Sequence, residues 1–201
     1  MQKEAAIMKV LLINPPFTNY GGMEGHGGKA PSINLGYLAA YIRQKNRYYK
    51  VSILDSEVLG LTFENIESRI KDYMPDVVGI TSSTPAYSSA VIIAGISKKV
   101  NRDITVVIGG VHPSALPQDT IREENIDFVV CGEGEITLFE LLEAIKEKRP
   151  FRDIDGIIFK EKGDLVQTRP RALIEDLDIL PFPARDLMPH NLYGPPVSKH
   201  L

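Results

Sequence analysis

The sequence of 201 residues contains one cysteine, Cys131, and this scarcity excludes several kinds of protein. A single thiol cannot form an intrachain disulfide, and it cannot supply the four thiolates that hold an iron–sulfur cluster. A chain without disulfides fits a reducing compartment, so we expect a cytoplasmic location.

Long hydrophobic runs and a surplus of one charge are also missing. No apolar run reaches the length of a membrane span, and the N-terminus lacks the apolar core of a signal peptide. Lys and Arg number 23 against 26 Asp and Glu, whereas nucleic-acid-binding proteins usually carry a basic surplus. We therefore expect no membrane span and no nucleic-acid partner.

Several catalytic and nucleotide-binding motifs are missing as well. The four histidines, at positions 26, 112, 190 and 200, have neither HxxxH nor HExxH spacing. There is no GxxxxGK(S/T) phosphate loop, and no GxGxxG follows the first predicted strand, so a nicotinamide dinucleotide site is not indicated. No set of nucleophile, base and orienting residue is visible. We therefore expect no catalytic residue in this chain.

What the sequence does contain is a regular alternation of strand and helix patterns. Short β-branched runs predict buried parallel strands, and apolar residues at i, i+3, i+4 and i+7 predict amphipathic helices. The predicted strands are residues 9–14, 50–55, 76–81, 104–108 and 127–131, and the predicted helices are residues 34–44, 63–74, 85–100, 117–124 and 137–148. This alternation predicts an α/β fold with a doubly wound, flavodoxin-like or Rossmann-like parallel sheet in the order 2-1-3-4-5.

The other segments define the expected domain organisation. Residues 1–8 are expected to be a disordered leader, and residues 9–150 the α/β domain. Residues 151–180 contain two short strand patterns around a turn at residues 161–164, which predicts an appended β-hairpin. Residues 181–201 are rich in proline and lack a periodic apolar face. We expect them to be a linker toward a further domain, and to be mobile without that domain.

The loops at the carboxyl ends of the predicted strands are unusual, and open α/β sheets bind ligands at this edge. Gly109 and Gly110 end the fourth strand, where a missing Cβ lets a ligand approach the backbone. A glycine-rich loop over residues 17–32 could wrap a ligand or be a plain surface loop, and the sequence leaves both open. For Glu133 and Glu135, balancing a helix dipole is a better explanation than catalysis.

Six short motifs follow one another along the chain. They are Asn14-Pro15-Pro16, Pro31-x-x-x-Leu35-Gly36-x-Leu38-Ala39, Asp76-Val77-Val78-Gly79-Ile80-Thr81, Gly109-Gly110-x-His112-Pro113, Gly132-Glu133-Gly134-Glu135 and Pro181-Phe182-Pro183-Ala184-Arg185-Asp186. This ordered set resembles the N-terminal cobalamin-binding domain of cobalamin-dependent radical SAM enzymes, and the last motif resembles the bridge into their radical SAM barrel.

The resemblance implies a domain that positions cobalamin for a radical SAM domain, in the same polypeptide or in a separate chain. S-adenosylmethionine and an iron–sulfur cluster would then belong only to that partner domain, and the parent enzyme would be of the methyltransferase or cyclase type. The cofactor contacts that it implies are Asn14, Pro15, Pro16, Ser82, Ser83, Thr84, Gly109, Gly110, Val111, His112, Pro113, Gly132, Glu133 and Gly134.

The loop after the first strand departs from one common pattern. Many cobalamin domains carry Asp-x-His-x-x-Gly there, and its histidine is the lower cobalt ligand, whereas this chain has Asn14-Pro15-Pro16-Phe17. His26 and His112 are the remaining candidates, and His26 is the weak candidate for the axial position. We expect neither to bind cobalt. The alternative function is a flavodoxin-like module that binds a flavin or nucleotide and no cobalamin.

Overall fold

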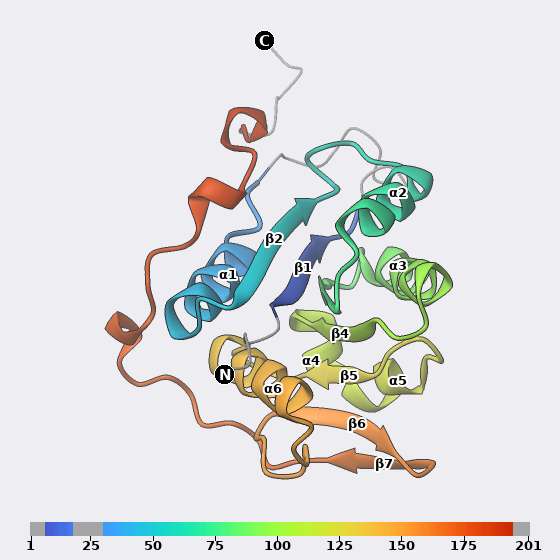
Figure 1. Cartoon of the computed structure of the whole chain (residues 1–201), viewed down its shortest axis with the longest axis vertical. Coiled ribbons are helices and arrows are strands. Elements are labelled where there is room, and N and C mark those ends of the chain that lie inside the picture. Colours follow the sequence, from blue (N-terminus) through green and yellow to red (C-terminus); the bar gives the residue numbers. More distant parts are fainter. Residues whose placement is uncertain (1–6, 18–29, 195–201) are drawn as a thin grey trace, which may run out of the picture.

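The computed structural model describes residues 7–17 and 30–194. Seven strands form one sheet in the order β2-β1-β3-β4-β5-β6-β7 (Figure 1). They are β1 (Met8–Asn14), β2 (Tyr49–Asp55), β3 (Val77–Thr81), β4 (Thr105–Gly109), β5 (Phe128–Val130), β6 (Ile157–Glu161) and β7 (Asp164–Gln167). The pairs among the first five strands are parallel, and β6 and β7 add antiparallel pairs. The predicted fold class and strand order are confirmed, and the predicted hairpin extends the same sheet.

Helices cover both faces of the sheet (Figure 1). One layer consists of α1 (Ile33–Lys45) and α6 (Glu135–Glu147), and the other of α2 (Phe63–Tyr73), α3 (Tyr87–Val100) and α5 (Pro117–Arg122). Successive strand residues point to opposite faces, so Leu12 and Val107 pack under α1 and α6 while Leu11 and Val106 pack under the second layer. Burial on both faces is why the strand sequences are continuous apolar runs.

One helix was not predicted. Helix α4 (Val111–Ala115) begins directly after the double glycine and contains Pro113. A proline is tolerated there because the first turn of a helix has no acceptors for its backbone N–H groups. The segment that the sequence presented as a loop is therefore partly helical. At the N-terminus, Met8 pairs with Tyr49 and belongs to β1, while residues 1–6 lie outside the described ranges.

The segment after β7 returns along the α1 side of the domain to the carboxyl end of β2 (Figure 1). The backbone N–H of Ala184 donates to the Gly36 carbonyl in α1 at 2.9 Å, and Ala184 and Met188 are buried. Tyr193 donates its hydroxyl hydrogen to Asp55 Oδ2 at 2.9 Å. These contacts argue against the expected mobility of residues 181–194, which stays a prediction that hydrogen exchange can test. Ala184 and Met188, four residues apart, are buried and fasten this segment to the domain, although its sequence has no periodic apolar face.

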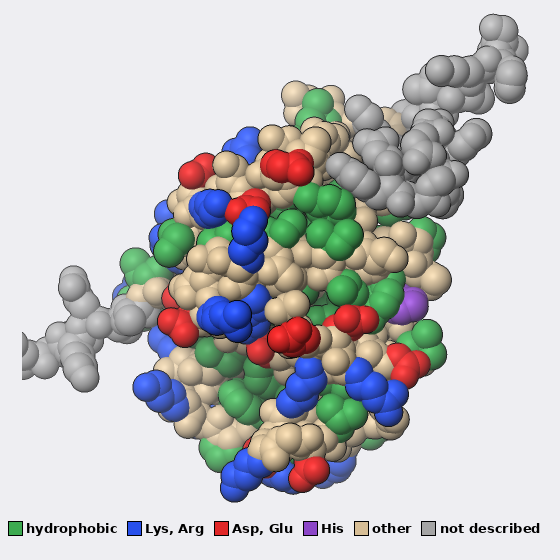
Figure 2. Space-filling model, turned by 90° about the vertical axis from the view of Figure 1, so that its right-hand side faces the viewer, with side chains coloured by type: hydrophobic (Ala, Val, Ile, Leu, Met, Phe, Trp, Pro, Cys, Tyr) green, Lys and Arg blue, Asp and Glu red, His purple; other side chains and the backbone are tan. Residues whose placement is uncertain are grey.

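Charged side chains on the surface are mixed in sign. On the face drawn in Figure 2, Lys and Arg lie among Asp and Glu and among hydrophobic side chains. Glu67 on α2 illustrates this, because Lys71 and Lys99 both donate hydrogen bonds to its carboxylate and lower its pKa to about 2. None of the helices in the described part of the chain is long and apolar enough to cross a membrane.

The packing of the C-terminal segment on α1 predicts the effect of replacing Gly36. A Cβ at Gly36 would lie 3.0 Å from Pro183 Cβ and 3.2 Å from Met188 Sδ. We therefore expect Gly36→Val to displace this segment, to remove hydrogen-exchange protection of the Ala184 amide and to lower the free energy of unfolding by roughly 1–3 kcal/mol.

The matched control is Gly95→Val, another glycine within a helix, where an added Cβ would lie an unstrained 3.6 Å from Asn125 Nδ2. Parent-like protection of the Ala184 amide in Gly36→Val would show that the segment does not depend on this contact.

Candidate functional site

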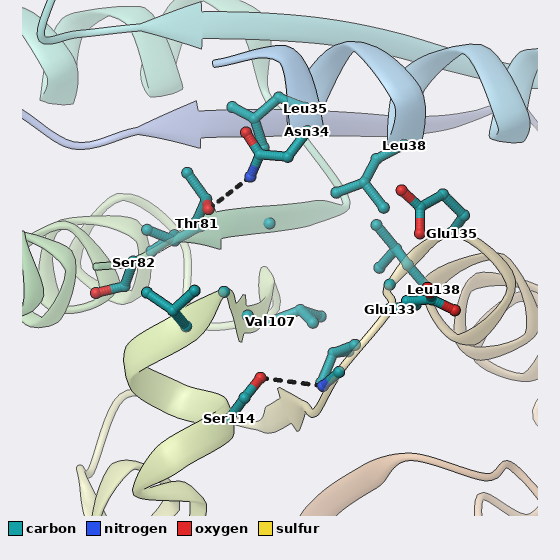
Figure 3. A pocket seen from close by; sticks show the side chains of 18 of the residues that line it. Asn34, Leu35, Leu38, Thr81, Ser82, Val107, Ser114, Glu133, Glu135 and Leu138 are labelled. Carbon is teal, nitrogen blue, oxygen red and sulfur yellow. Dashed lines mark hydrogen bonds between the residues drawn. The ribbon is translucent and has the colours of Figure 1, made fainter. Parts of the chain in front are cut away.

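A cleft of about 840 Å³ lies at the carboxyl ends of the parallel strands, between the sheet and helices α1 and α6 (Figure 3). Its floor is formed by strand side chains that face these helices, and α1 and α6 contribute apolar walls. The floor residues are Leu12, Gly79, Val107 and Val130, and the wall residues are Leu35, Leu38 and Leu138. The cleft is therefore a mainly apolar cavity that opens at the edge where α/β sheets bind ligands.

Gly79 gives the cleft its depth. It lies in the middle of β3, opposite Leu12 on β1 and Val107 on β4. A Cβ at this position would lie 2.8 Å from Leu12 Cδ2. Any other residue here would crowd Leu12 and fill the floor of the cleft. Glycine weakens a strand interior. At position 79 the open space of the cleft therefore outweighs the lower strand propensity of glycine.

The two glycines at the end of β4, Gly109 within the strand and Gly110 directly after it, have different roles. Gly110 has φ +106°, and a Cβ on it would lie 2.7 Å from the Ser82 carbonyl oxygen and 2.9 Å from the Ser82 nitrogen. It is therefore required by the backbone itself, which brings the β4 loop against the β3 loop. A Cβ at Gly109 would lie an unstrained 3.5 Å from the Val130 carbonyl oxygen. Gly109 thus leaves room at the cleft without being needed for the fold.

Hydrogen bonds between segments far apart in the sequence shape the mouth of the cleft (Figure 3). Asn34 Nδ2 at the start of α1 donates to Thr81 Oγ1 at the end of β3 at 2.8 Å. The Gly132 amide donates to Ser114 Oγ on α4 at 3.0 Å. The mouth therefore presents hydroxyl, amide and backbone groups around an apolar interior, an arrangement suited to a ligand with an extended body and a polar edge.

The structure brings eight of the predicted contact residues together at this cleft. These are Ser82, Ser83, Gly109, Gly110, Val111, Gly132, Glu133 and Gly134. Predicted residues outside the lining are Asn14, Pro15, Pro16, Thr84, His112 and Pro113. Asn14 donates its side-chain amide to Asp55 on β2 at 2.8 Å. The side chain of Asn14 therefore points to the β2 side, whereas the cleft lies over β1, β3, β4 and β5.

His112 packs away from the cleft. Its Nδ1 lies 3.2 Å from Thr84 Oγ1, and its ring centroid is 4.1 Å from that of Tyr87 on α3. Helix α4 is what turns this side chain, because it carries His112 on the side facing α3. The other candidate, His26, lies outside the described residues.

Several residues of the cleft were not predicted. They are Leu12, Asn34, Leu35, Leu38, Gly79, Ile80, Thr81, Val107, Ser114, Ala115, Val130, Glu135, Leu138 and Leu173. Gly79 carried a usable signal, because a glycine within a strand indicates a close approach to the backbone. The leucines of α1 and α6 carried none, since a wall of a cleft and a buried core face have the same helical periodicity.

No group of three or more His, Cys, Asp or Glu in residues 7–17 and 30–194 is placed to hold a metal ion. Cys131 packs against the cluster on the opposite face of the sheet, and burial raises the pKa of its thiol. The cleft itself lacks a metal centre of its own among the described residues, and what it offers a ligand is shape, hydrogen bonds and apolar surface.

Comparison with known proteins places this arrangement in a family. The family model for the B12 binding domain matches residues 25–142. An uncharacterized methyltransferase of Pyrococcus horikoshii is 39% identical over 188 residues, which cover 93% of this chain and 40% of that protein. The anaerobic magnesium-protoporphyrin IX monomethyl ester cyclase of Rubrivivax gelatinosus is 34% identical over 176 residues, which cover 85% of this chain and 31% of that protein.

Solved structures share the fold at lower identity. OxsB, a cobalamin-dependent S-adenosylmethionine radical enzyme solved with aqua-cobalamin and S-adenosylmethionine bound, matches with a TM-score of 0.73 and 23% identity, covering 90% of this chain and 24% of OxsB. The radical S-adenosylmethionine methyltransferase TsrM of Kitasatospora setae was solved with cobalamin and an iron–sulfur cluster. It matches with a TM-score of 0.67 and 22% identity, and the match covers 84% of this chain and 30% of TsrM.

This chain spans less than half the length of the curated relatives described above. The match to the family model includes the β3, β4 and β5 loops that form the mouth of the cleft. The extent of that match and the 39% identity over 93% of the chain show that the protein belongs to the B12-binding domain family.

Proposed function

We propose that this chain holds cobalamin in the cleft under α1 and α6 and presents it to a radical SAM domain. The observation that supports this placement is the floor and mouth of the cleft, where Gly79 and Gly109 leave space that a Cβ would occupy. A long, narrow part of a ligand can enter there between the sheet and the helices. The nucleotide tail of cobalamin has that shape, and the corrin ring is too wide to follow it.

Residues of the cleft then divide into two groups. Leu12, Leu35 and Leu138 would pack on the tail, and Thr81 with Ser82 would hydrogen-bond it at the mouth. Thr84, one of the expected cofactor contacts, lies outside the lining, whereas Thr81 belongs to it. The loops around Val111, Gly132 and Gly134 would face the ring.

The cofactor supplies the cobalt chemistry when bound, while the protein supplies binding, orientation and exclusion of water. Its one cysteine cannot hold an iron–sulfur cluster, so reductive cleavage of S-adenosylmethionine would need a separate domain. The names of the relatives, which include methyltransferases and cyclases, support a parent enzyme of one of these types. Residues 9–150 would form the binding domain, residues 151–180 its hairpin extension, and residues 181–201 the linker to the partner.

The space at Gly109 provides the most direct test of the placement. We expect Gly109→Val to weaken cobalamin binding by at least about tenfold, because its methyl groups would occupy the tail channel. Binding is measured by titration of the visible spectrum, which also distinguishes cobalamin from a flavin.

Thermal unfolding should be unchanged in Gly109→Val, and Gly95→Val, far from the cleft, should bind as the parent does. Gly110 is unsuitable for this test, since any side chain there collides with the Ser82 backbone. Parent-like affinity of Gly109→Val would contradict the placement of the tail.

The lower face of cobalt gives a second prediction. His112 is engaged with Thr84 and Tyr87, and the loop after β1 has no histidine at the usual position. We expect bound cob(II)alamin to be base-off, without nitrogen superhyperfine splitting from the protein in its electron paramagnetic resonance spectrum. A splitting that disappears in His26→Ala would instead identify His26 as the axial ligand.

A third prediction concerns the division of labour between domains. The isolated chain, after treatment with iron and sulfide, should neither retain a four-iron cluster nor cleave S-adenosylmethionine under reducing conditions, because it lacks the thiolates to hold one. The products to measure are methionine and 5′-deoxyadenosine. Their formation by this chain alone would refute the need for a partner domain.

A further inference from the structure

The segment that follows β7, residues 168–174, crosses the first half of α6, and we call it the strap. Its near end is held by Arg169, whose carbonyl oxygen accepts a hydrogen bond from the Gly156 amide at 2.7 Å. Arg171 Nε then donates to Thr137 Oγ1 at 2.6 Å, and the guanidinium forms an ion pair with Glu140. Because the Arg171 side chain is only 15% exposed, a largely buried cation fastens the middle of the strap to α6.

Glu133 fastens the far end of the strap. Its Oε2 accepts a hydrogen bond from the Ile174 amide at 2.7 Å. A carboxylate that accepts from a backbone N–H forms a charge-assisted hydrogen bond, stronger than one between neutral groups. The side chain expected to touch the cofactor therefore already has a structural partner, 41 positions along the chain.

Leu173 lies between these two attachments, and it is the strap residue among those that line the cleft. Its side chain is 76% exposed, although it is apolar and sits on a well-fastened segment. The strap thus holds an uncovered leucine at the rim of the cavity. A ligand that fills the cleft and spreads over its mouth would cover that leucine.

We propose that Leu173 contacts the bound corrinoid at the mouth of the cleft, and that Glu133 is a positioning residue that holds Leu173 there through the Ile174 amide. This proposal rests on the proposed cobalamin function. It replaces the expected direct contact from Glu133 with an indirect role, and it adds a contact from a part of the chain outside the match to the family model.

Truncating Leu173 measures the contact. Covering much of a leucine side chain contributes enough that Leu173→Ala should weaken binding of hydroxocobalamin by about five- to tenfold. The matched control is Leu177→Ala, because Leu177 is 63% exposed and lies outside the lining of the cleft. It should change the affinity by less than about twofold.

Two variants of Glu133 separate positioning from direct contact. Glu133→Ala removes the acceptor of the Ile174 amide, so it should abolish hydrogen-exchange protection of that amide in the ligand-free protein and weaken cobalamin binding as much as Leu173→Ala does. Glu133→Gln keeps an oxygen acceptor and should restore both. In the double variant Glu133→Ala/Leu173→Ala the two losses should not add, because they remove the same contact.

Thermal unfolding of each variant is the control, and a parent-like unfolding temperature shows that the domain is intact. Parent-like affinity of Leu173→Ala, or additive losses in the double variant, would overturn this inference while leaving the proposed function standing. Failure of the parent chain itself to bind hydroxocobalamin would overturn the proposed function, and the ligand-free exchange result would still decide whether Glu133 holds the strap.

Discussion

The absence of a Cβ at two strand positions is the constraint on which the cleft depends. Close packing between a sheet and its helices normally leaves few voids larger than a water molecule. Here Gly79 and Gly109 stand where the neighbouring strands carry Leu12, Val107 and Val130 on the same face. The space above the glycines stays open between the sheet and helices α1 and α6. A cavity of this kind costs packing energy that a ligand can recover.

The rim of the cavity is built from segments that lie far apart in the sequence. Asn34 at the start of α1 holds Thr81, Ser114 on α4 holds the Gly132 amide, and Glu133 holds the strap after β7. Each contact joins segments that are far apart in the sequence, so the mouth takes its shape only when the whole sheet is assembled. Such a rim is preorganised, which reduces the entropy that a ligand must offset on binding.

The C-terminal segment is also attached to the edge of the sheet at which the cleft opens. Asp55 is fully buried at the end of β2, and its carboxylate accepts hydrogen bonds from Asn14 and Tyr193. A buried carboxylate needs such partners. Burial, together with the nearby Asp55, raises the pKa of Tyr193 above its ordinary value, so the phenol stays a donor across the physiological range. Residue 193 is thereby tied to the edge of the sheet at which the cleft opens.

Sequence alone determined the fold class, the strand order and the family resemblance, because hydrophobic periodicity and loop glycines are local signals and the alternation of strand and helix leaves few topologies. It also indicated Ser82, Gly109 and Gly132 as residues of the ligand edge. Only the tertiary structure decided that Asn14 turns toward Asp55, that α4 carries His112 against Tyr87, and that Glu133 holds a strap bearing Leu173. Those outcomes depend on which loops meet across the sheet, and the side chains that meet are separated by tens of residues, so no local pattern in the chain contains them.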